Sequence, residues 1–133
     1  MEQNVYVVSA VRSAIGDFGG IFRTLTPIQL VAPVMKASIE RSGLLIDKIG
    51  KVILGNTLSP LNPNIARGAA ITCGIPPEVP SFSIHCACAS AMQALISGAS
   101  ALMMGEAETA LVGGVESMSN APYILASTRW GQR

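Results

Sequence analysis

Residues 82–114 read FSIHCACASAMQALISGASALMMGEAETALVGG, and the folding pattern of the chain is clearest there. The apolar, β-rich run 82–87 predicts a buried strand. The uncharged run 90–104, closed by Gly105, predicts a helix that is buried on nearly all sides. A further apolar run, residues 109–112, predicts another strand. This order indicates a right-handed strand–helix–strand unit with parallel strands.

The residues before this unit continue the alternation. Two short apolar runs, residues 5–11 (VYVVSAV) and 51–56 (KVILGN), predict buried strands. Thr26 followed by Pro27 is typical of a helix start, and this helix should end near Ser42. A similar cap-and-proline pair opens a helix over residues 62–73. The order βαβαβαβ predicts an α/β fold with a mostly parallel sheet covered by helices on both faces.

The composition indicates a surface that other protein covers. Half of the residues are hydrophobic and 13% are charged, against roughly 25% charged in an average soluble domain. The longest uncharged stretch, residues 79–105, is interrupted by polar side chains and prolines, so a strand and a buried helix explain it better than a membrane span.

Charge and cysteine content narrow the function classes. The net charge is +1, from nine basic and eight acidic residues without a basic stripe, so we expect no nucleic-acid partner. The opening residues MEQNVYVVSAVR lack the features of a secretory signal, and three cysteines, an odd number, favour free thiols over disulfides. The expected location is the cytoplasm.

Cys88 is the candidate nucleophile. It follows a predicted strand and directly precedes a predicted helix, and open α/β sheets place active groups at the carboxyl ends of strands. Unpaired N–H groups and partial positive charge at a helix N-terminus favour a thiolate there. The alternative from position alone is a buried structural thiol.

Two neighbours of Cys88 leave other chemistry open. Cys86, two residues away in a strand, would share its face, so a redox pair and a metal site are the alternatives. One histidine and two cysteines make a poor ligand set for a metal. His85, three residues away, would point to the opposite face, which weakens a Cys–His pair and favours an interior histidine. Cys73 is expected in the core.

At these residues the chain resembles the thiolase family over its whole length. The matching segments follow one order: residues 7–16 (VVSAVRSAIG), 52–56 (VILGN), 62–67 (NPNIAR), 113–123 (GGVESMSNAPY) and 129–131 (RWG). The resemblance implies a thiolase-like layered fold, with residues 1–117 as the amino-terminal half of the core and residues 118–133 as the start of a loop domain.

The resemblance also implies the chemistry. Thiolases transfer acyl groups between coenzyme A thioesters, condensing acetyl-CoA or cleaving 3-ketoacyl-CoA through a cysteine acyl-enzyme, and Cys88 aligns with that cysteine. Its backbone N–H would serve in the oxyanion hole. Coenzyme A enters as part of the substrate, with no other cofactor and no metal. His85, Ala89 and Ala91 depart from the family pattern, which has asparagine at the first position, glycine at the second and glycine or serine at the third.

The family is longer than this chain, and its later half supplies further catalytic groups. The resemblance therefore implies a complementary C-terminal half as partner, a homodimer or tetramer as the complete enzyme, and little activity in this polypeptide alone. A non-catalytic thiolase-like assembly partner is the main alternative, and a cysteine-based redox module is the second.

Overall fold

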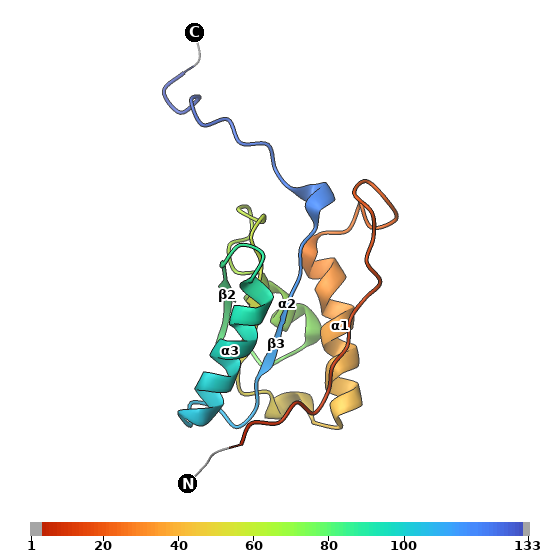
Figure 1. Cartoon of the computed structure of the whole chain (residues 1–133), viewed down its shortest axis with the longest axis vertical. Helices are drawn as coiled ribbons and strands as arrows, with labels where there is room; N and C mark the ends of the chain where they lie inside the picture. Colours follow the sequence, from red (N-terminus) through yellow and green to blue (C-terminus); the bar gives the residue numbers. More distant parts are fainter. Residues whose placement is uncertain (1–3, 132–133) are drawn as a thin grey trace.

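The computed structural model describes residues 4–131 and shows three layers. A central sheet is formed by β1 (Val52–Gly55), β2 (Ser81–Ile84) and β3 (Leu111–Gly114). Its order is β2-β1-β3, and β1 pairs in parallel with both neighbours. The predicted α/β class with a parallel sheet is confirmed (Figure 1).

Three helices cover the sheet. α1 (Pro27–Ser42) packs on α2 (Ile65–Cys73), and α2 lies on β1 and β2. α3 (Ser90–Met103) packs on β1 and β3, on the opposite face (Figure 1). Short 3-10 turns occur at Ile46–Lys48 and Met118–Asn120.

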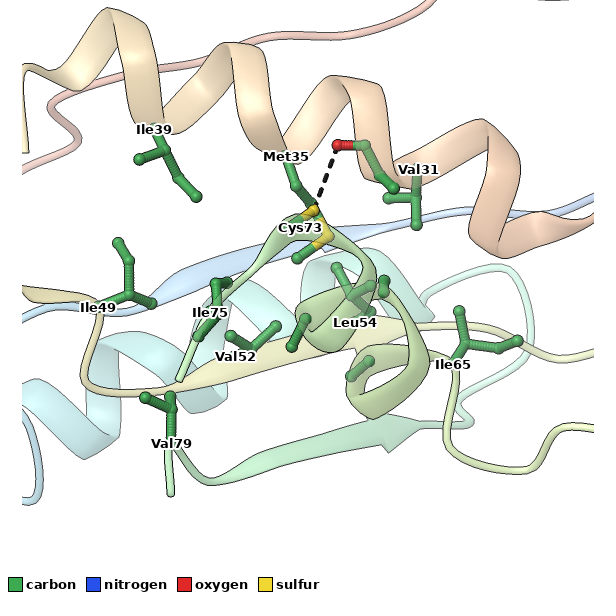
Figure 2. Close-up of a cluster of buried hydrophobic side chains, with 14 residues drawn as sticks. Val31, Met35, Ile39, Ile49, Val52, Leu54, Ile65, Cys73, Ile75 and Val79 are labelled. Atoms are coloured by element: carbon green, nitrogen blue, oxygen red, sulfur yellow. Dashed lines mark hydrogen bonds between the residues drawn. The ribbon is translucent and has the colours of Figure 1, made fainter. Parts of the chain in front are cut away.

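The main core lies between the sheet and the α1–α2 layer. Val52 and Leu54 of β1 point into this cluster, where Met35, Ile65 and Ile75 are also buried (Figure 2). Because side chains alternate along a strand, the equally buried Ile53 faces α3 instead. β1 is therefore buried on both faces, as expected for the central strand of a parallel sheet.

Local signals predict both ends of α1 correctly. Thr26 caps α1 in a capping box with Gln29, and Gly43 ends it in the left-handed conformation. Asn64 caps α2 by accepting from the N–H of Arg67, so the cap lies two residues later than predicted at Asn62 and α2 begins at Ile65.

The strand predicted at residues 5–11 is wrong for the described chain. The segment runs alongside α1 without joining the sheet, and Tyr6, Val7 and Val8 are 74%, 76% and 67% exposed (Figure 1). A strand needs a neighbour for its backbone hydrogen bonds, and the three-stranded sheet does not pair with this segment.

Three other predictions are corrected in detail. β2 ends at Ile84, three residues earlier than predicted, and β3 covers Leu111–Gly114 in place of residues 109–112. α3 is not buried on nearly all sides: Ala94 is fully buried, whereas Met92 and Ile96 are 62% and 49% exposed. Its apolar composition reflects one face on the sheet and one uncharged, exposed face.

Among the described residues, no helix is long and apolar enough to cross a membrane.

After Met118–Asn120 the chain extends away from the three layers (Figure 1). The proposed boundary between residues 117 and 118 stays a prediction.

Candidate active site

Cys88 lies in a short turn at the carboxyl edge of the sheet. Because the three strands are parallel, β1, β2 and β3 end at one edge, and the turn of residues 85–89 connects the end of β2 to the start of α3. Cys88 is exposed and its thiol is free. The predicted position, after a strand and before a helix, is therefore confirmed, and the alternative of a buried structural thiol is wrong.

The hydroxyl of Ser90 holds this turn together. It accepts a hydrogen bond from the N–H of Cys86 at 2.8 Å and donates one to the carbonyl of Ala87 at 2.6 Å. The N–H groups of Ala89 and Ser90 donate to the carbonyls of Cys86 and Ala87 at 3.0 and 3.1 Å. None of these four hydrogen bonds uses the N–H of Cys88. Ser90 is itself 5% exposed.

The backbone of the turn is strained at the residue before Cys88. Ala87 has a φ of 47°, the only positive φ of a non-glycine residue within residues 4–131. The left-handed region costs an alanine about 1–2 kcal/mol, because Cβ approaches its carbonyl oxygen. Such a conformation persists where surrounding contacts hold it, and it concentrates at functional sites.

The neighbours of Cys88 lie differently from the prediction. Residues 85–89 form a turn and not a strand, so alternation does not decide which of them share a face. His85 is exposed, not interior; its Nδ1 accepts a long hydrogen bond from the N–H of Ala87, at 3.4 Å. Cys86 is exposed and free like Cys88. Across the described part of the chain, no three His, Cys, Asp or Glu side chains group as a metal site would require.

The third cysteine belongs to the core, as predicted. Cys73 at the end of α2 is 6% exposed, and its Sγ–H donates to the carbonyl of Ala32 in α1 at 3.3 Å (Figure 2). Burial raises the pKa of the Cys73 thiol, and Lys36 opposes this only in part. A protonated, buried thiol is a structural group and a poor nucleophile.

Glu116 is a residue of this edge whose role the sequence did not reveal. Its carboxylate accepts hydrogen bonds from Asn56 Nδ2 at 2.9 Å, from the N–H of Thr57 at 2.8 Å, from the N–H of Leu58 at 3.2 Å and from the Thr57 hydroxyl. The carboxylate therefore fixes the loop after β1 to the segment after β3. Its partners are about sixty residues away in sequence, so no local pattern could have revealed them.

The segment after β3 also holds the glycine-rich loop before α1. Ser117 donates to the carbonyl of Leu25 at 3.0 Å, and the side-chain amide of Asn120 donates to the same oxygen at 2.9 Å. Ser119 accepts from the N–H of Gly19 at 2.8 Å. A cavity of about 430 Å³ lies beside this segment, lined by residues 11–18, α1 and residues 114–119, and Cys88 is not among its lining residues.

Comparison with known proteins identifies the family of this arrangement. The family model described as "Thiolase, N-terminal domain" matches residues 5–133. Beta-ketothiolase BktB of Cupriavidus necator is 37% identical over all of this chain, which spans 34% of that protein. An acetyl-CoA acetyltransferase of the same organism is 40% identical over 98% of the chain and 33% of its own length.

Two solved structures share the fold. The acetyl-CoA acetyltransferase of Bacillus anthracis superposes with a TM-score of 0.92 and 41% identity, over 96% of this chain and 32% of that one. The Acat5 thiolase of Ascaris suum, solved in complex with coenzyme A, gives 0.89 and 39%, over 93% and 33%. The chain thus spans about a third of the length of these proteins. With the model match, the identities and the superpositions in agreement, the chain belongs to the thiolase family.

Proposed function

We propose that this chain forms part of an acyl-CoA:acetyl-CoA C-acyltransferase in which Cys88 carries the acyl group. The observation that supports it most directly is an exposed, free thiol in a strained turn at the carboxyl edge of the sheet, directly before α3. Relatives with 37–41% identity are named acetyl-CoA acetyltransferase or beta-ketothiolase. Acyl-CoA thioesters are accordingly the proposed substrates, and coenzyme A enters only as part of them.

In the proposed reaction, the Cys88 thiolate attacks the carbonyl of an acyl-CoA. The bond from the acyl carbon to the coenzyme A sulfur breaks, coenzyme A leaves and takes a proton, and an acyl thioester on Cys88 remains. A second acetyl-CoA then loses a proton from its methyl carbon, and that carbon attacks the acyl group. A carbon–carbon bond forms and the Cys88 thiolate is released; thiolysis is the reverse.

The backbone N–H of Cys88 is the proposed donor to the oxygen that becomes negative in both steps. A donor fixed in place before the reaction stabilises this charge without reorganisation, which is the usual source of rate enhancement in acyl transfer. This role needs a rigid peptide plane before Cys88.

Condensation needs more groups than this edge offers. A base must remove the proton from the second acetyl-CoA, and the chain spans about a third of its relatives' length. We infer that a complementary C-terminal part supplies the base, that the complete enzyme is a cytoplasmic homodimer or tetramer, and that this polypeptide alone is nearly inactive.

Mass spectrometry after mixing with acetyl-CoA tests the proposal. The protein is purified with any complementary chain retained, and a Cys88→Ser variant runs in parallel. An acetyl group on the peptide that contains Cys88, absent from the variant, supports the acyl-enzyme. No acetyl group in the presence of a folded complementary chain contradicts it and favours the thiolase-like assembly partner.

A further inference from the structure

We propose that Ser90 is a positioning residue for acyl transfer, because its hydroxyl aims the N–H of Cys88. This inference rests on the proposed function of Cys88. It concerns a side chain that need not touch the substrate and acts through the backbone of the turn.

The argument begins with one peptide plane. The carbonyl of Ala87 and the N–H of Cys88 belong to the same trans peptide group, so they point in opposite directions. The Ala87 carbonyl accepts two hydrogen bonds, from the Ser90 hydroxyl at 2.6 Å and from the Ser90 N–H at 3.1 Å. Because the peptide is planar, holding the carbonyl oxygen in one direction fixes the Cys88 N–H in the opposite direction.

This peptide is the mobile one in a turn of this kind. The hydrogen bond from the N–H of Ala89 to the carbonyl of Cys86 closes a four-residue turn with Ala87 and Cys88 at its centre. The peptide between the two central residues is the one whose rotation interconverts turn types. Ala87 itself stands at a φ of 47°, which an alanine disfavours, so the contacts of this turn also hold a strained residue.

Ser90 also binds the other side of the turn. The same oxygen that donates to the Ala87 carbonyl accepts from the N–H of Cys86. One hydroxyl thus bridges the peptide before Cys86 and the peptide after Ala87. Removing it takes one hydrogen bond from each peptide, and the Ala87 carbonyl keeps only the longer bond from the Ser90 N–H.

The hydroxyl stands on a rigid support. Ser90 is the first residue of α3, and α3 is seated against β1 and β3 where those strands end in glycine. A Cβ at Gly55 would lie 2.4 Å from the carbonyl carbon of Ser90, and one at Gly114 would lie 2.5 Å from the Cβ of Ala91. The backbone of Ser90 therefore cannot follow a moving turn, and positioning groups are most effective on such elements.

Two reactions of the Cys88 thiol separate positioning from general damage. Alkylation by iodoacetamide needs the thiolate but develops no oxyanion. Acetylation by acetyl-CoA needs the thiolate and also develops an oxyanion that must be stabilised. We expect Ser90→Ala to slow acetylation of Cys88 about 10- to 100-fold, since loss of an oxyanion donor costs about 10²- to 10³-fold. Its alkylation rate should stay within about twofold of the original protein.

A matched control is available on the same helix. The Ser100 hydroxyl donates to the carbonyl of Ile96 at 2.9 Å, a hydroxyl-to-backbone bond remote from the turn. Ser100→Ala should leave both rates unchanged. Ser90→Thr keeps the hydroxyl and should restore most of the acetylation. Circular dichroism melts confirm that each variant is folded.

The outcomes are distinct. Slow acetylation with normal alkylation in Ser90→Ala, rescued by Ser90→Thr, supports the inference. Equal loss of both rates, unchanged acetylation, or a folded Ser90→Thr as slow as Ser90→Ala overturns it while the proposed function stands. No acetylation of the original protein in the presence of its folded complementary chain, with normal alkylation, overturns the proposed function and this inference with it.

Discussion

A Cβ atom at position 55 would lie 2.4 Å from the carbonyl carbon of Ser90, so β1 and α3 meet backbone to backbone where the turn enters the helix. No real Cβ tolerates such a contact with a backbone atom. The glycine at the end of β1 therefore sets how closely α3 approaches the sheet, and with it the position of the Cys88 turn.

We expect Gly55→Ala to lower the free energy of unfolding by about 3 kcal/mol, because overpacking a tight contact costs about 1–3 kcal/mol and both partners here are backbone. Urea unfolding followed by circular dichroism measures it. Gly113→Ala on β3 is the matched control, since its Cβ would meet Leu54 at 3.6 Å, an ordinary contact. Equal losses in the two variants would contradict the backbone contact as the cause.

The ends of α1 show what a sequence predicts well. Thr26, Pro27 and Gly43 are local signals that act within one helical turn, and α1 begins and ends where they indicate. The parallel sheet was also predictable, because alternating strands and helices leave few other arrangements.

Non-local contacts explain what the sequence did not predict. The apolar residues 5–11 have strand propensity, but a strand also needs a partner, and propensity does not supply one. The run 82–87 is β-rich throughout, yet the Ser90 hydroxyl turns the chain after Ile84. The place of Cys88 before a helix makes it a candidate, the resemblance to thiolases aligns it with the nucleophile, and its role as acyl carrier stays a prediction.

Glu116→Gln should destabilise the protein by about 2 kcal/mol. The carboxylate of Glu116 accepts from Asn56, Thr57 and Leu58 with both oxygens, whereas glutamine turns a donating NH₂ group toward one set of donors. Chemical denaturation measures the loss.

Glu106→Gln is the control for removing a carboxylate charge. Glu106 pairs with Lys51 and its side chain is 47% exposed, so its loss should cost less than about 1 kcal/mol. If the two variants were equally stable, the carboxylate of Glu116 would not be holding the loop after β1.

Cys73 should make stability fall at alkaline pH. Burial raises the pKa of its thiol above the ordinary value of 9.0, so the unfolded chain loses this proton at lower pH than the folded one. The stabilisation is complete below about pH 9 and is lost as pH rises from there through the raised pKa.

The comparison with Cys73→Ala isolates this effect. The difference in unfolding free energy between the original protein and the variant should shrink between about pH 9 and pH 11, while other titrating groups cancel. A difference that is constant over this range would show that the Cys73 thiol titrates alike in both states.

Cys86→Ser should leave the acetylation of Cys88 within about threefold of the original rate. The turn uses only the backbone of Cys86: its N–H donates a hydrogen bond to the Ser90 hydroxyl, and its carbonyl accepts one from the N–H of Ala89. A serine at this position keeps both hydrogen bonds. Peptide mass spectrometry after a pulse of acetyl-CoA measures the rate. A redox module built on the two exposed thiols predicts a different result. Mild oxidation with a disulfide reagent would remove two hydrogens from the original protein, and either Cys86→Ser or Cys88→Ser would abolish this change. Neither thiol would carry an acetyl group. Acetylation that survives Cys86→Ser and disappears in Cys88→Ser would therefore assign the chemistry to one cysteine of the pair.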